Sequence, residues 1–213
     1  DNKIICVDRD IHSINGTEST IIKFFPQTIF IQDHVMLDQA FACFLARKHL
    51  LTDEELFIGT CDSGMDYDVE KFQKLRNDFD VIVLSHTNDE NIEHNPDAHS
   101  WLRVDEENNK IKSISLKKTI SNSPMNDHAT TGMFWFKKSM TFLASLEEMI
   151  WNNDNLNGKY YVDKVIQYCI NAGYKVAFFD VNYISWGTPY DYENYENTIR
   201  YWTEFIEVEK LNE

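Results

Sequence analysis

The sequence has 213 residues, of which 43% are apolar and 14% aromatic, and this is the composition of a packed globular protein. Its 35 acidic and 20 basic residues give a formal net charge of −15, and no basic run is longer than a pair of lysines. This charge excludes a nucleic-acid groove or an anionic membrane surface as the expected partner, and no apolar run has the length of a membrane span.

Short β-branched or aromatic runs predict strands, and apolar residues at helical spacing predict the helices between them. In chain order we expect strands at 3–7 and 28–31, a helix over 37–51, a strand at 56–61, a helix over 69–79 and strands at 81–85, 111–115 and 132–137. A helix over 139–153, a helix over 161–173, a strand at 175–181 and a final amphipathic helix over 192–211 follow. Asp38 and Ser139 are placed to cap helix starts, and Gly173 to end a helix.

Strands that alternate with helices of this length favour an α/β fold with a mixed, mainly parallel sheet. The stretch 80–136 departs from this alternation, because strand candidates follow one another there through polar loops. We therefore expect an antiparallel excursion in that stretch. With no internal repeat and no linker, the chain is expected to form a single domain over 1–213.

The four cysteines, Cys6, Cys43, Cys61 and Cys169, lie far apart and show no C-x-x-C spacing. This spacing favours reduced thiols in the core over a zinc site or a disulfide framework. Without a signal-peptide pattern, the sequence predicts a cytoplasmic protein.

An apolar, strand-like run ends in an acidic cluster within FIGTCDSGMDYD, residues 57–68, which contains Asp62, Asp66 and Asp68. A strand that stops at a carboxylate can present a metal ligand at the carboxyl edge of an α/β sheet. The same pattern also starts ordinary loops and caps helices. The residues alone leave both interpretations open.

Three stretches, in this order, resemble motifs of the sugar-phosphate nucleotidyltransferases. They are LFIGTCDSGMDYD (56–68), SISLKKTISNSPMNDHATTGMFWFKK (113–138) and NGKYYVDKVIQYCINAGYKVAFFDVNYISWGTPYDYENY (157–195). The similarity is greatest to members from capsule and lipopolysaccharide gene clusters, some of which act on phosphorylated groups other than ordinary hexoses. The resemblance implies a Rossmann-like fold of the GT-A type.

The resemblance also implies an activity, namely transfer of a nucleoside monophosphate from a nucleoside triphosphate to a sugar 1-phosphate or similar acceptor, with release of pyrophosphate. In the family such enzymes supply surface polysaccharide synthesis. Mg²⁺ would be held by Asp62, and Lys118 would neutralise the acceptor phosphate. Gln39 matches a position that contacts the base, while Gly132 and Asp163 match positions near the sugar.

Each of these residues also has an ordinary structural explanation. Asp62 could order a turn, Lys118 could be a solvated surface lysine, and Gly132 could serve a β-bulge. Gln39 and Asp163 could be surface residues at helix starts. A homo-oligomer is compatible with the sequence.

The family's glycine-rich loop, which cradles the triphosphate, has no match in this chain. Because residues 3–7 resemble the family's second strand, the missing unit is expected upstream of Asp1, which would make the fold truncated at its N-terminus. The alternative is a protein that does not bind a nucleotide in the family's usual way.

Single residues also depart from the family pattern. Trp186 stands where many relatives carry a second metal-binding aspartate, and Asp191 could compensate only if its turn folds back. Lys117 replaces the acid of a Glu-Lys pair. Asp38 replaces a small glycine and is expected to crowd the base pocket.

Two other functions fit parts of the sequence. A regulatory pseudoenzyme that binds nucleotide sugars would retain the sugar-facing half without phosphate-loop and metal residues. A GT-A glycosyltransferase would use Asp66 and Asp68 as an Asp-x-Asp metal motif, although the WGTPYD ending, residues 186–191, counts against it.

Overall fold

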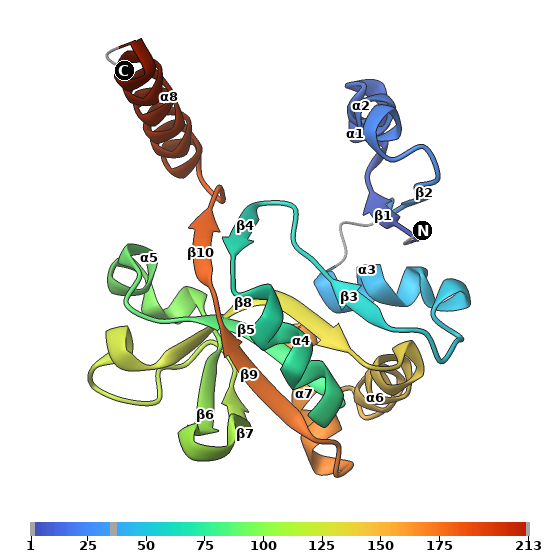
Figure 1. The fold of residues 1–213 in the computed structure, drawn as a ribbon. Helices are drawn as coiled ribbons and strands as arrows, with labels where there is room; N and C mark the ends of the chain where they lie inside the picture. The colour runs from blue at the N-terminus through green and yellow to red at the C-terminus, as the bar shows by residue number, and fades with distance from the viewer. Residues whose placement is uncertain (1–2, 35–37, 212–213) are drawn as a thin grey trace.

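The computed structural model describes residues 3–34 and 38–211, and a curled six-stranded sheet forms its centre (Figure 1). The strand order is β3 (Leu56–Ile58), β8 (His128–Phe136), β5 (Val81–His86), β9 (Val176–Asp180), β7 (Lys110–Ser115) and β6 (Trp101–Asp105). Strand β6 also pairs with the beginning of β8, so the far edge of the sheet turns back toward its middle.

Two small sheets complete the β-structure. β1 (Ile5–Asp8) and β2 (Ile29–Gln32) are parallel and are connected through α1 (Asp10–Ile14) and α2 (Thr17–Phe24). β4 (Ser63–Asp66) and β10 (Asn182–Ser185) are antiparallel. The second pair matters for function, because it joins the segment after β3 to the segment before the last helix.

Helices cover both faces of the central sheet. α6 (Ser139–Trp151) and α7 (Val162–Asn171) pack on one face, and α4 (Val69–Asp78) packs on the other. The inner strand β5 shows why both faces are covered, since Val81 and Val83 join the first core cluster and Ile82 and Leu84 join the second. Fully buried strands of this kind read as continuous apolar runs.

The remaining helices are α3 (Gln39–Leu45), α5 (Glu90–His94) and α8 (Pro189–Leu211), with short 3₁₀ turns at Arg47–His49, Pro96–Ala98, Glu106–Asn108 and Pro124–Asn126. Leu37, with which the predicted helix over 37–51 begins, lies outside the described residues. In the described part of the chain, no helix combines the length and the apolar character that a bilayer crossing requires.

The sheet is mixed, as expected, but it is not mainly parallel. Of the neighbouring strands in the described six-stranded sheet, β5 and β9 pair in parallel, whereas the other pairings are antiparallel. The reason is that β8 inserts between β3 and β5 in the opposite direction, and β7 inserts likewise between β9 and β6. The antiparallel excursion expected over 80–136 is confirmed. It contains β7 and β8, the two strands whose insertion makes most pairings in the sheet antiparallel.

The expected helix caps are confirmed at two of three positions. The backbone N–H of Phe41 donates to Asp38 Oδ1 at 3.1 Å, and Gly173 ends α7 with a φ of +87°. Ser139 is not an N-cap but the first residue of α6, and its hydroxyl donates to the carbonyl oxygen of Thr52 at 2.7 Å. The serine therefore fixes the helix to the loop before β3.

The cysteines are free, but they do not all lie in the core. Cys169 is buried, Cys6 and Cys43 are half-buried, and Cys61 is exposed. The prediction that all four are core residues is wrong for Cys61, because β3 ends at Ile58 and Cys61 lies in the loop between β3 and β4.

Candidate active site

Asp62 lies in the loop between β3 and β4, beside the turn that leads into α8. Its carbonyl oxygen accepts a hydrogen bond from the backbone N–H of Trp186 at 2.8 Å, and the next residue, Ser63, pairs with Ser185 across β4 and β10. Among the described residues, none forms a hydrogen bond or ion pair with the exposed Asp62 carboxylate. The backbone is fixed while the carboxylate stays available.

Trp186 fills the space next to Asp62 with an apolar ring. A Cβ atom on Gly64 would lie 2.8 Å from this indole, so the ring lies against the bare backbone of β4. The indole also contacts Tyr195 of α8, with 5.3 Å between ring centroids. The position at which the family that the motifs resemble often carries a metal-binding aspartate is therefore occupied here by a packed aromatic side chain.

Asp191 does fold back toward this turn, but its carboxylate is already engaged. Its Oδ2 accepts hydrogen bonds from the hydroxyl of Ser185 at 3.2 Å and from the backbone N–H of Thr188 at 3.1 Å. These contacts order the first turn of α8. Asp191 therefore has a structural role in this turn.

The donor set can be compared with what a magnesium ion requires. The described residues contain no group of three or more His, Cys, Asp or Glu side chains arranged to hold a metal ion. Mg²⁺ at phosphate-transfer sites commonly uses one or two carboxylates, with waters and substrate phosphates as its further ligands. An exposed and unpaired carboxylate such as Asp62 fits that mode of binding. Without substrate phosphates, this single carboxylate does not form a complete metal site.

Two of the predicted substrate-binding residues meet close to Asp62. Gln39 Nε2 donates to the carbonyl oxygen of Gly132 at 2.9 Å, which links the first turn of α3 to β8. Gly132 has a φ of +78°, and a Cβ atom there would lie 3.0 Å from Thr60 Cγ2. Gln39, Gly132 and the loop that carries Asp62 therefore form one group at this end of the sheet.

Asp38 has a structural role beside that group. Its Oδ1 caps α3, and its Oδ2 accepts a hydrogen bond from the backbone N–H of Tyr160 at 2.6 Å. The carboxylate thus connects the start of α3 to the segment before α7. This engagement accounts for an acidic residue where the family pattern has a glycine.

Asp163 is buried at the start of α7 rather than lying on the surface. Its side chain accepts a hydrogen bond from the Thr130 hydroxyl at 2.6 Å. Burial raises the pKa of Asp163, although the hydrogen bond from Thr130 and the charge of Lys117 act in the opposite direction. The residue links α7 to β8 beneath the region of Gly132.

The two lysines of the Lys-Lys pair differ in their surroundings. Lys117 has a φ of +52°, and its ammonium group donates to the carbonyl oxygen of Ala98 and lies 5.4 Å from the centre of the Tyr161 ring. No hydrogen bond or ion pair joins the Lys118 ammonium group to another residue in the described part of the chain. The structure therefore places Lys117, not Lys118, beside Tyr161 and near Asp163.

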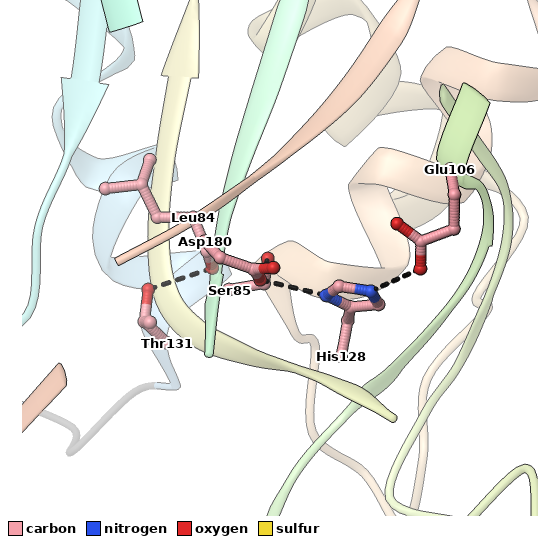
Figure 2. Close-up of polar contacts among 6 residues, drawn as sticks. All are labelled: Leu84, Ser85, Glu106, His128, Thr131 and Asp180. Atoms are coloured by element: carbon pink, nitrogen blue, oxygen red, sulfur yellow. Dashed lines mark hydrogen bonds and ion pairs between the residues drawn. The ribbon is translucent and has the colours of Figure 1, made fainter. Parts of the chain in front are cut away.

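A charged cluster around His128 was not anticipated from the sequence (Figure 2). His128 Nδ1 lies 2.9 Å from Asp180 Oδ1 and Nε2 lies 2.9 Å from Glu106 Oε1, while the Ser85 hydroxyl donates to the same Asp180 oxygen at 2.7 Å. Burial lowers the pKa of His128, but the two carboxylates outweigh it and raise the pKa to about 9. The imidazolium therefore bridges two carboxylates at neutral pH.

A second histidine, His86 at the end of the neighbouring strand β5, has the opposite character. His86 is 2% exposed, and its ring stacks on Tyr183 with 4.5 Å between centroids. Burial lowers the pKa of His86 to about 4, so the ring is neutral at physiological pH. The only sequence signal for either histidine was its place at the end of a predicted strand or within the HATTG segment, 128–132.

Comparisons with known proteins show which solved structures share the fold of this chain. No protein-family model matches the sequence, and no curated protein matches it. Solved structures do match. A nucleoside-diphosphate-sugar pyrophosphorylase from Vibrio cholerae aligns with a TM-score of 0.74 at 15% identity, over 91% of this chain and 80% of the other.

Two further solved structures share the same fold. The inositol-1-phosphate CTP transferase from T. maritima gives a TM-score of 0.62 at 17% identity, over 89% of this chain and 71% of the other. A UDP-glucose pyrophosphorylase in complex with UDP-glucose gives 0.67 at 12% identity, over 94% and 81%. At such identities the likeness shows the fold, which this chain shares with nucleotide-sugar pyrophosphorylases and related nucleotidyltransferases.

Proposed function

We propose that the protein is a nucleotidyltransferase that transfers a nucleoside monophosphate from a nucleoside triphosphate to a sugar 1-phosphate or similar phosphorylated acceptor, releasing pyrophosphate. The observation that carries the proposal is the Asp62 carboxylate, which is exposed and unpaired among the described residues, on a backbone held by Trp186. The shared fold and the order of the three sequence motifs support it. A role in surface polysaccharide precursor synthesis rests on the motifs alone.

The chemistry needs few reactive groups. The nucleophile is a phosphate oxygen that is already an anion, so the protein has to align two anionic substrates and neutralise their charge. Bound to Asp62, Mg²⁺ would supply positive charge to the phosphate oxygens. The net charge of −15 makes such local cations more important, because the molecule as a whole repels nucleotides.

The remaining residues would position the substrates. Gln39 and the backbone at Gly132 would contact the base and the sugar, respectively, and Asp163 would fix the wall of the sugar site through Thr130. Lys118, whose ammonium group has no partner among the described residues, would neutralise the acceptor phosphate. Lys117 would act from the other side by holding the segment around Ala98.

A screen for pyrophosphate release tests this proposal. Each of the four common nucleoside triphosphates is combined with a panel of sugar 1-phosphates, inositol 1-phosphate and other phosphorylated acceptors, with Mg²⁺ or with EDTA. We expect pyrophosphate to appear in at least one combination, to require both substrates and to stop with EDTA. Tight binding of a nucleotide sugar without any turnover would contradict the proposal.

That contrary outcome would favour a regulatory binding protein. One observation supports this alternative, namely that Trp186 occupies the place of a second metal-binding carboxylate. A cytoplasmic location, which the cysteine spacing predicts, is compatible with either function.

The glycosyltransferase alternative is weakened by the surroundings of Asp68. Its carboxylate caps α4 by accepting the backbone N–H of Lys71 at 3.0 Å, and it lies 3.6 Å from the Lys71 ammonium group. An Asp66-x-Asp68 metal motif would have to give up this cap. Consumption of a nucleotide sugar without pyrophosphate would nevertheless identify that activity.

A further inference from the structure

The last helix, α8, leaves the body of the molecule after β10 and projects away from the central sheet (Figure 1). Its first turns contact the body, since Tyr195 packs against Trp186. A cavity of about 390 Å³ lined by α5, β10 and α8 extends along the helix as far as Thr198. The following turns extend beyond this contact.

This projecting helix carries a regular apolar face. Tyr192, Tyr195, Ile199, Trp202 and Ile206 follow one another at alternating spacings of three and four residues. With 3.6 residues per turn, such spacing puts all five side chains on one face. The opposite face carries Glu193, Asn197, Arg200 and Glu204.

The apolar face is exposed over most of its length. Tyr192 is 49% exposed, Ile199 51%, Trp202 53% and Ile206 49%. Phe205 extends the face at one side and is 46% exposed. Half-exposed side chains of this size present about 100 Å² each, so the face offers about 500 Å² of apolar surface.

The area of the apolar face and the spacing of its residues match a second helix of the same kind. A stable protein interface buries about 800 Å² on each partner, and a monomer seldom exposes an apolar patch as large as this one. The three-four repeat is the seam of a coiled coil, in which two equivalent helices fill each other's gaps. Such a seam is self-complementary about a twofold axis.

The charge of the chain argues against an anionic membrane surface as the occupant of this face. Acidic residues border the seam, and the net charge of −15 opposes insertion into an anionic membrane surface. We propose that the α8 face pairs with α8 of a second copy of this chain, so that the protein is a homodimer held by a two-helix seam. The inference does not depend on the proposed catalytic activity.

Light scattering after size exclusion, between about 1 and 100 μM chain, tests the dimer, because dimerisation depends on concentration by mass action. The wild type should elute with twice the 25.1 kDa mass of one chain. Ile199→Asp and Trp202→Asp should each weaken the dimer at least about tenfold, because each places a charge in the centre of the seam.

Two matched controls test whether the effect belongs to α8. Trp151, at the end of α6, is 90% exposed, and Phe24, on α2, is 74% exposed. Trp151→Asp and Phe24→Asp should leave the dimer intact, and thermal unfolding should show that all four variants fold. A monomeric wild type, a dimer that persists in both α8 variants, or equal dissociation by Phe24→Asp would overturn the proposal.

Discussion

At the scale of single residues, His128 shows how a polar side chain can fasten distant segments. Its ring lies between Asp180, at the end of β9, and Glu106, in the turn between β6 and β7 (Figure 2). The His128 side chain is 11% exposed, while those of Asp180 and Glu106 are 42% and 69% exposed, so water screens both ion pairs in part and the pair with Glu106 more strongly. The cluster therefore secures the curled edge of the sheet.

This cluster makes stability depend on pH. The pKa of His128 is raised from 6.5 to about 9 on folding, so its stabilising charge is fully present below pH 6.5 and is lost as pH rises through 9. Urea unfolding at pH 6 and pH 9.5 should show His128→Gln less stable than wild type by about 2 kcal/mol at the lower pH and by much less at the higher pH. A gap that does not change with pH would refute the assignment.

Gly132 gives a second prediction at this scale. Its φ of +78° disfavours any other residue, and a Cβ atom would also press on Thr60 at 3.0 Å. Gly158 has the same φ of +78° but no atom within 4 Å of the added Cβ, so it is a matched control for backbone strain. In urea unfolding, Gly132→Ala should lose about 1–3 kcal/mol, and Gly158→Ala less. Equal losses would show that the contact with Thr60 has no effect.

The lysine pair shows a limit of sequence reasoning at single positions. Motif alignment selects Lys118 for the acceptor phosphate, and this stays a prediction; what it did not anticipate is that Lys117, with its positive φ, lies near Asp163 and Tyr161. Adjacent residues of one type cannot be ranked by pattern, because their directions depend on a backbone angle that the sequence does not reveal.

At the scale of elements, Asp38 connects two helices. One carboxylate oxygen caps α3, and the other accepts the N–H of Tyr160, which lies 122 residues further along the chain. We expect Asp38→Ala to lower the free energy of unfolding by about 1–3 kcal/mol, through loss of both the cap and the long-range hydrogen bond. The measurement is urea unfolding.

The control for this prediction is Asp68→Ala, since Asp68 caps α4 without a long-range hydrogen bond. It should destabilise the protein less than Asp38→Ala. If the two variants were equally destabilised, the bond to Tyr160 would contribute nothing.

Long apolar patterns predicted their elements well, and short polar ones did not. The strands β5 and β9 and the helices α4 and α7 lie within two residues of their expected bounds, because each has a buried face that fixes the pattern. The strand β4, with sequence SGMD, was missed because it has almost no apolar signal and depends on pairing with β10. The helices α1, α2 and α5 and the strands β6 and β10 were also missed.

At the scale of the whole molecule, the candidate site is formed by contacts that the sequence only partly reveals. The order of motifs predicted that the Asp62 loop and the WGTPYD turn serve one site, and the pairing of β4 with β10 brings them together. An antiparallel excursion over 80–136 was predicted, but the place of β7 and β8 in the strand order was not, because an apolar pattern does not specify which neighbours a strand pairs with. The cluster around His128 depends on that strand order.

The same fold is kept at 12–17% identity in the compared structures, so packing constrains the sheet far more than it constrains individual residues. The chemistry must therefore be tested at the residue that the proposal singles out. Asp62 and Asp66 are both exposed carboxylates in the same acidic segment, which makes them a matched pair.

The most direct test compares Asp62→Asn with Asp66→Asn in Mg²⁺-dependent release of pyrophosphate. Asp62→Asn should lower the rate by about 100-fold or more, because the amide cannot replace the charge of a metal-binding carboxylate, while thermal unfolding should remain unchanged. Asp66→Asn should retain the wild-type rate. Full activity of Asp62→Asn in the presence of Mg²⁺ would contradict the central claim that this carboxylate serves nucleotidyl transfer.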